Sequence, residues 1–222
     1  MGGLKMPVMV YMHEGGFHFG GGSTFHGPQF FMDRNVVLVM FNYRLGAHGF
    51  LSFEDDWLPG NYGLKDQLMA LKWVQANIEN FGGDPKSVTI FGQSAGGSSV
   101  HYHMISTKSR GLFSRAIVQS GNAMSPWALI PKGLARSRAI LASERLGCPT
   151  DGRTTDDLLG CLRNVTARDL AAVHESFLVS GKHHEWGGGG GDGQTSATLL
   201  QVPYPMVMLP RASTTSISNK SR

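Results

Sequence analysis

The motif Gly92-Gln93-Ser94-Ala95-Gly96 lies between an apolar stretch ending at Phe91 and a segment predicted to be helical as far as Met104. In a sharp strand-to-helix turn a serine adopts a strained backbone, and glycines two positions before and after it avoid clashes. Such a turn exposes the hydroxyl group, which can then attack a carbonyl carbon. In a chain with 30 glycines, the five-residue pattern is also compatible with an ordinary loop. Its position between a strand and a helix favours a nucleophile elbow with Ser94 as the nucleophile.

A second glycine-containing segment, His13-Glu14-Gly15-Gly16-Phe17, directly follows the first apolar stretch. Attack on a carbonyl creates an oxyanion, which needs N–H donors already aimed at it. In serine hydrolases with an elbow, donors come from the residue after the nucleophile and from an upstream loop. The backbone N–H groups of Gly15, Gly16 and Ala95 are therefore the candidate oxyanion hole. The alternative is a plain glycine-rich turn.

The elements that must position these residues follow an alternating strand and helix pattern. Nearly continuous apolar runs are typical of parallel strands covered on both faces. One apolar stripe with steps of three and four predicts a helix, made by Leu64, Leu68, Leu71, Val74 and Ile78. This order favours a parallel sheet with right-handed crossovers, hence an α/β fold. We expect strands at 7–12, 36–41, 88–91 and 116–118, and helices at 134–146, 156–163 and 167–177.

Composition and charge exclude several classes of function. The chain has 222 residues, 41% hydrophobic and 16% charged, enough for one sizeable core. The net charge of +4 is too small and too dispersed for a nucleic-acid interface. No apolar run is long enough to span a membrane, and the opening 13 residues show no signal-peptide cleavage site. No cofactor motif or set of metal ligands is present.

The composition changes near Trp186, where five consecutive glycines are followed by a Ser/Thr-rich end. Such a segment cannot bury enough apolar surface to offset its ordering entropy. We expect a partial α/β domain at 1–186 and a disordered tail at 187–222.

Several motifs besides the elbow match a known family in order. Together they resemble the type-B carboxylesterases and cholinesterases, α/β-hydrolases, and look most like the insect carboxylesterases. The resemblance covers about residues 6–178. The motifs are Asn42-Tyr43-Arg44, Gly49-Phe50-Leu51, 60–67, Trp73-Val74, 81–85, His101-Tyr102-His103-Met104 and Gln119-Ser120-Gly121.

The resemblance implies an α/β-hydrolase core with a partial parallel central sheet and flanking helices. It also implies hydrolysis of small carboxylic esters through an acyl-enzyme, by a Ser-Glu-His triad with three oxyanion donors. Ser94, Gly15, Gly16 and Ala95 fall on those motif positions, and Trp127 resembles an acyl-pocket residue. Glu14 stands where the family more often has glycine.

The family resemblance also covers the two cysteines. Cys148 and Cys161 match a small family disulfide loop, although two free buried thiols are the alternative. A disulfide implies a secretory compartment. The glycosylation sequon Asn164-Val165-Thr166 agrees with this, and a second sequon begins at Asn219.

Parts of the family pattern lie outside the matched stretch, namely early strands, the signal peptide and the triad Glu and His. His101 and His103 lie seven and nine positions beyond Ser94 on the predicted helix, about 10 Å or more along its axis. They are too far away to take its proton. We therefore expect a catalytically incomplete, aggregation-prone fragment of an ester hydrolase. The alternative is a non-catalytic cholinesterase-like binding or adhesion module, but the intact elbow argues against it.

Overall fold

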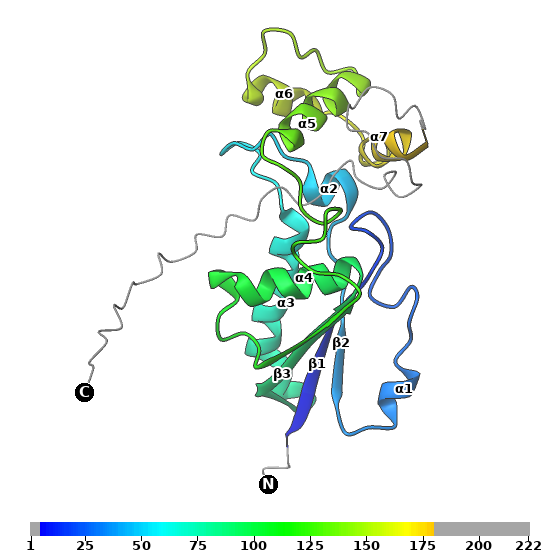
Figure 1. Ribbon diagram of the computed structural model, residues 1–222, viewed down its shortest axis with the longest axis vertical. Helices are drawn as coiled ribbons and strands as arrows, with labels where there is room; N and C mark the ends of the chain where they lie inside the picture. The colour runs from blue at the N-terminus through cyan, green and yellow to red at the C-terminus, as the bar shows by residue number, and fades with distance from the viewer. Residues whose placement is uncertain (1–4, 180–222) are drawn as a thin grey trace, which may run out of the picture.

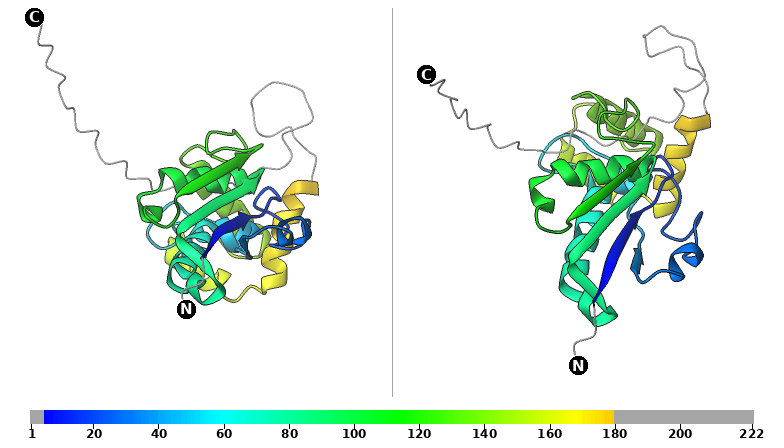
Figure 2. Two further views of the ribbon diagram at one scale, coloured as in Figure 1. Left: turned by 90° about the horizontal axis from the view of Figure 1, so that it is seen from below. Right: turned by 60° about the horizontal axis from the view of Figure 1, so that its bottom comes forward.

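The computed structural model describes residues 5–179, in which four parallel strands form one sheet. Their order across the sheet is β2-β1-β3-β4, and the register pairs Val10 with both Val39 and Ile90. Figure 2 shows the strands side by side with β4 at one edge. The α/β fold with a parallel sheet is confirmed. The strands are β1 (Met6–Met12), β2 (Val37–Met40), β3 (Gly83–Gln93) and β4 (Arg115–Gln119).

One face of the sheet is covered by α3 (Tyr62–Asn77) and α4 (Ala95–Ile105). Alternate residues of a strand point to opposite faces, so the even-numbered positions of β1 and β3 share this side. They form a buried apolar cluster with Leu71, Val74 and Ile78, which confirms the second half of the predicted helical stripe. Leu64 and Leu68, in its first half, are only partly buried. The cluster comprises Val8, Val10, Met12, Leu71, Val74, Ile78, Val88, Ile90 and Val100.

The opposite face is only partly covered by the described residues. Tyr11 and Phe91 are buried there, with their ring centroids 5.1 Å apart, and Phe31 of α1 (Gln29–Met32) packs on Phe91. Ile117, which pairs with Phe91 in the register, is 44% exposed. The strands formed by the continuous apolar runs are therefore not completely buried on both faces within residues 5–179.

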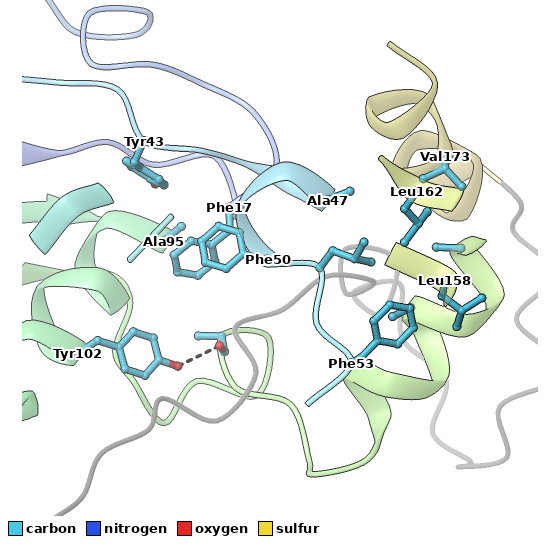
Figure 3. Packing of buried hydrophobic residues seen from close by; sticks show 14 of the residues in the cluster. Phe17, Tyr43, Ala47, Phe50, Phe53, Ala95, Tyr102, Leu158, Leu162 and Val173 are labelled. Atoms are coloured by element: carbon cyan, nitrogen blue, oxygen red, sulfur yellow. Dashed lines mark hydrogen bonds between the residues drawn. The ribbon is translucent and has the colours of Figure 1, made fainter. Parts of the chain in front are cut away.

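The remaining helices gather at the end of the molecule opposite the N-terminus, beyond the carboxyl ends of the strands (Figure 1). They pack with α2 (Gly46–Phe50) on a second apolar cluster that includes Phe50, Phe53, Leu158 and Leu162. Figure 3 shows this cluster. The helices are α5 (Leu134–Arg145), α6 (Thr155–Leu162) and α7 (Ala167–Val179). Two 3-10 turns lie earlier in the chain, where η1 (Ile78–Phe81) follows α3 and η2 (Thr107–Ser109) follows α4.

Cys148 and Cys161 form a disulfide between the end of α5 and α6, with their Cα atoms 5.8 Å apart. The expected disulfide is confirmed, and the free-thiol alternative is wrong. Thr154 and Asp157 form a capping box that starts α6. The expected domain boundary at 186 and the tail at 187–222 lie outside the described residues.

Candidate active site

Ser94 occupies the sharp turn between β3 and α4. Its backbone has φ 54° and ψ −118°, a sparsely populated region that is strained for any residue other than glycine. The Ser94 N–H donates to Gln119 O at 2.9 Å, and the Ser94 carbonyl accepts from Ser98 N at 2.9 Å. The turn is thus fixed both to the end of β4 and to the first turn of α4. The predicted strand-turn-helix setting is confirmed, and Ser94 itself is half-buried.

The two motif glycines are required because other backbone segments approach them closely. A Cβ atom on Gly96 would lie 1.9 Å from Met12 O, and one on Gly92 would lie 2.6 Å from the same oxygen. On the other side of the turn, a Cβ atom on Gly121 would lie 2.1 Å from Ser94 O. The elbow is therefore enclosed by the end of β1 and by the loop after β4.

The glycine loop after β1 is also held in an unusual conformation. Gly15 and Gly16 have φ values of 112° and 61°, and Phe17 has φ 66° although it is not glycine. The Gly15 carbonyl accepts from the N–H groups of His18 and Phe19, which closes a tight turn. Phe17 is buried against Phe50, with ring centroids 5.1 Å apart. Packing therefore maintains the strained backbone at this loop.

His13 anchors the start of this loop from inside the protein. Its side chain is 1% exposed, stacks on Tyr43 with ring centroids 4.2 Å apart, and its Nδ1 lies 2.7 Å from Glu14 O. The Tyr43 hydroxyl donates to His13 O at 2.9 Å. Burial lowers the pKa of His13, although Glu14 partly opposes the shift. The neutral ring thus serves as a packing and positioning group rather than as a base.

Glu14 belongs to a polar cluster that the sequence did not reveal. Its carboxylate accepts a hydrogen bond from the Tyr11 hydroxyl and lies 2.8 Å from His26 Nε2. Burial, together with the Glu14 carboxylate, raises the pKa of Tyr11. The acidic residue at the family's glycine position is therefore held beside the loop rather than left in solvent. Tyr11 and His26 gave no pattern in the sequence, because their contact with Glu14 forms only in the folded chain.

The N–H groups of the three predicted oxyanion donors are not engaged in hydrogen bonds with the described rest of the site. Within residues 5–179, the N–H groups of Gly15, Gly16 and Ala95 form no hydrogen bond with another described residue. Ala95 is the first residue of α4, whose first N–H groups have no partner within the helix. All three N–H groups are thus able to donate to a ligand. Their convergence on one oxyanion remains a prediction.

The two histidines of α4 are engaged away from Ser94. His103 is buried, with Nδ1 2.8 Å from Ser109 Oγ and Nε2 3.0 Å from Gln67 Oε1. His101 Nδ1 accepts from Ala123 N at 3.2 Å. Neither is bonded to the Ser94 hydroxyl, in agreement with the distance argued from the helix rise.

The other predicted site residues lie in the helical end of the molecule and in the loop after β4. Trp127 is partly buried and packs on the apolar cluster that contains Ala95 and Phe17. Asn164 is exposed after α6, and its Nδ2 donates to Gly160 O at 3.0 Å. Among the residues that the structure describes, no group of three or more His, Cys, Asp or Glu side chains is placed to hold a metal ion. In the same part of the chain, no helix has the length and apolar character needed to cross a membrane.

Comparison with known proteins places this geometry among esterases. A model of the carboxylesterase family matches residues 2–214. The juvenile hormone esterase of Tribolium castaneum is 50% identical over 177 residues, which cover 79% of this chain and 30% of that protein. Cholinesterase 1 of Branchiostoma lanceolatum is 42% identical over 202 residues, which cover 90% of this chain and 53% of that protein.

A solved structure shows the same arrangement of elements. The crystal structure of juvenile hormone esterase from Manduca sexta, with OTFP covalently attached, matches with a TM-score of 0.75 and 37% sequence identity. The match covers 78% of this chain and 33% of that chain. The present chain thus spans between about a third and a half of the length of these relatives.

Proposed function

Because the chain belongs to the carboxylesterase family, we propose that it carries the nucleophile and the oxyanion donors of a carboxylic ester hydrolase. The observation that carries this proposal is the strained backbone of Ser94 at the turn from β3 to α4. A non-catalytic binding module has no need for a nucleophile held in this conformation.

The proposed reaction begins when Ser94 Oγ attacks the carbonyl carbon of an ester and transfers its proton to a general base. The carbonyl oxygen becomes an oxyanion, which accepts hydrogen bonds from the N–H groups of Gly15, Gly16 and Ala95. Collapse of this intermediate releases the alcohol and leaves the acyl group on Ser94. Water then attacks the acyl-enzyme, which releases the carboxylic acid and restores the hydroxyl. The covalent ligand in the Manduca sexta relative supports a mechanism through a covalent intermediate.

The described residues do not place a general base in contact with Ser94. His101 and His103 bind other partners, and His13 is held on the loop that precedes the oxyanion donors. In a serine protease that carries the same type of triad on an unrelated fold, loss of the histidine costs about 10⁶ in kcat, while the oxyanion hole and binding keep about 10³ over water. We therefore propose acyl transfer to Ser94 as the chemistry of this chain, with both acylation and deacylation slow because each step needs the base.

Substrate and compartment follow from the same family membership. We propose small carboxylic esters as substrates, and Trp127 as part of the wall that contacts the acyl group. The Cys148–Cys161 disulfide supports a secretory compartment, because such bonds persist in oxidising environments. Asn164 is exposed, so its sequon is open to glycosylation.

The deciding experiment treats the 222-residue chain with p-nitrophenyl acetate and identifies the acetylated residue by peptide mass spectrometry. We expect acetylation of Ser94 without rapid multiple turnover, and none at this position in Ser94→Ala. Ser137→Ala, on the exposed side of α5, is the matched control and is expected to behave as the parent chain. Failure to acetylate Ser94 would contradict the proposal and favour the binding module. Rapid turnover that Ser94→Ala abolishes would show that this chain supplies its own base.

A further inference from the structure

Tyr102 lies on α4 two turns beyond the nucleophile, with its side chain 3% exposed. Its hydroxyl donates to Ala128 O at 2.9 Å and lies 3.4 Å from Ala123 O (Figure 3). Ala123 and Ala128 are five positions apart in the loop that follows β4. One buried hydroxyl therefore joins the two ends of the segment that carries Trp127.

Two further side chains of α4 bind the same loop near its start. Ser98 Oγ donates to Asn122 O at 3.0 Å, and His101 Nδ1 accepts from Ala123 N at 3.2 Å. These two contacts hold the beginning of the loop. Among the side chains of α4, only the Tyr102 hydroxyl reaches the other end of the loop at Ala128, beyond Trp127.

Trp127 shares an apolar cluster with residues adjoining the reacting groups. The cluster contains Ala95, which follows Ser94, and Phe17, which follows the two oxyanion glycines. Tyr102 and both alanines of the loop are buried in it. Because protein interiors are close-packed, a shift of the loop is transmitted to Trp127 and to its neighbours beside Ser94.

We propose that Tyr102 is a positioning residue that fixes the loop carrying Trp127 and thereby limits the length of the acyl group that Ser94 accepts. This rests on the proposed function, in which Trp127 forms part of the acyl wall. Removal of the hydroxyl leaves buried carbonyl groups at Ala123 and Ala128 with one fewer donor. The loop then moves away from the cluster, and the space for an acyl chain increases.

The experiment compares Tyr102→Phe with the parent chain in two measurements. The first is the rate of Ser94 acylation by p-nitrophenyl acetate and by p-nitrophenyl hexanoate. We expect the hexanoate-to-acetate ratio to rise about fivefold in Tyr102→Phe, the change typical of one lost hydrogen bond, and to rise further in Trp127→Ala. A purely structural loss would lower both rates and leave their ratio unchanged.

The second measurement is deuterium uptake of peptides covering 122–128, which does not depend on catalysis. We expect faster uptake in Tyr102→Phe than in the parent chain. Tyr62→Phe is the matched control, because Tyr62 contacts Arg44 and Lys65 through its ring and keeps those contacts without its hydroxyl. We expect this control to change neither the uptake nor the acylation ratio.

The outcomes separate this proposal from the proposed function. An unchanged acylation ratio in Tyr102→Phe would overturn the role in acyl length, even with faster exchange. Unchanged exchange at 122–128 would overturn the positioning role. If Ser94 is not acylated in the parent chain, the proposed function is wrong, and the proposed limit on acyl length is wrong with it. The deuterium uptake of peptides 122–128 still decides whether Tyr102 holds the loop.

Discussion

At the scale of single residues, the glycines of the elbow are explained by close approach more than by turn flexibility. The sequence motif predicts that glycines on both sides of Ser94 avoid clashes. At Gly96, which lies in α4, the clash is with the carbonyl group of Met12 at the end of β1, which occupies the space of a side chain. The motif therefore reflects how closely β1, β3 and α4 approach one another, and this also brings the glycine loop after β1 close to Ser94.

We predict that Gly96→Ala lowers the free energy of unfolding by about 1–3 kcal/mol or more, because the new methyl group overpacks a site with no free space. Gly160→Ala is the matched control, since nothing lies within 4 Å of its Cβ position on helix α6. It is expected to raise stability by about 0.5–1 kcal/mol through helix propensity. Urea unfolding of both variants measures the difference. Equal midpoints would contradict the close approach of Met12.

His103 shows how a histidine near a nucleophile serves packing rather than catalysis. It joins α4 to Gln67 on α3 and to Ser109, and Gln67 Nε2 in turn donates to Ser99 Oγ at 3.0 Å. Burial lowers the pKa of His103 to about 4, so its ring is neutral in the folded protein. This network fixes the helix that begins at the elbow.

The pH dependence of stability follows from this pKa. In the unfolded chain the histidine takes up its proton near pH 6.5. Between about pH 4 and 6.5 the unfolded state binds more protons, so stability decreases as the pH falls, by at most about 1.4 kcal/mol per pH unit from this group. We expect His103→Gln to show a smaller loss of stability over this range, measured by urea unfolding. His48→Gln, at an exposed position of α2, is expected to retain the dependence of the parent chain. The same pH dependence in His103→Gln would contradict this.

At the scale of elements, two adjacent carboxylates connect the loop after α2 to the helical end of the molecule. Glu54, with φ 56°, accepts from the N–H groups of Gly133 and Ala135 at the start of α5. Asp55 accepts from Thr155 Oγ1 at 2.6 Å and from Arg136 Nη1 at 3.2 Å, and so connects α6 with α5. Burial raises the pKa of Asp55, but the hydrogen bonds to its carboxylate lower the pKa by a larger amount. The pKa of Asp55 therefore lies below its usual value. Asp55 is therefore charged at neutral pH.

We predict that Asp55→Ala destabilises α5 and α6 by about 2 kcal/mol, because several donors lose a charged acceptor. Hydrogen exchange by mass spectrometry is expected to show faster deuterium uptake in both helices. Asp56→Ala is the control, since Asp56 is the exposed neighbour of Asp55. Equal uptake in the two variants would show that the carboxylate does not hold these helices.

The sequence predicted the long elements and missed what depends on tertiary contacts. The apolar stripe predicted α3 because Leu71, Val74 and Ile78 are buried against the sheet. Toward the start of the helix the buried positions are instead Gly63 and Gln67. β3 begins at Gly83, before the predicted strand at 88–91, because Gly83 and Pro85 are residue types that disfavour a strand. Pro85 is tolerated near an irregularity in the register with β1. Helices α1 and α2 are too short to show a period. The pairing of Glu14 with His26 joins two loop positions, so no local pattern indicated it.

At the scale of the whole molecule, the sheet has one well-covered face and, within residues 5–179, two edge strands, β2 and β4. Strand β4 pairs only with β3 among the described strands, and its Ile117 and Val118 are 44% and 39% exposed. An exposed apolar edge strand offers unpaired backbone groups to another chain.

We predict that the 222-residue chain self-associates through β4 and that Ile117→Lys reduces this association, because a charged side chain on an edge strand opposes pairing. Size-exclusion chromatography with light scattering, run over a range of protein concentrations, measures the mass of the species formed. Met69→Lys is the matched control, since Met69 is 67% exposed on α3, away from the edge. It places the same charge on the protein and is expected to leave the association unchanged. If both variants reduce the mass equally, net charge rather than the β4 edge controls association. A parent chain that is monomeric at every concentration would show that the β4 edge does not mediate self-association.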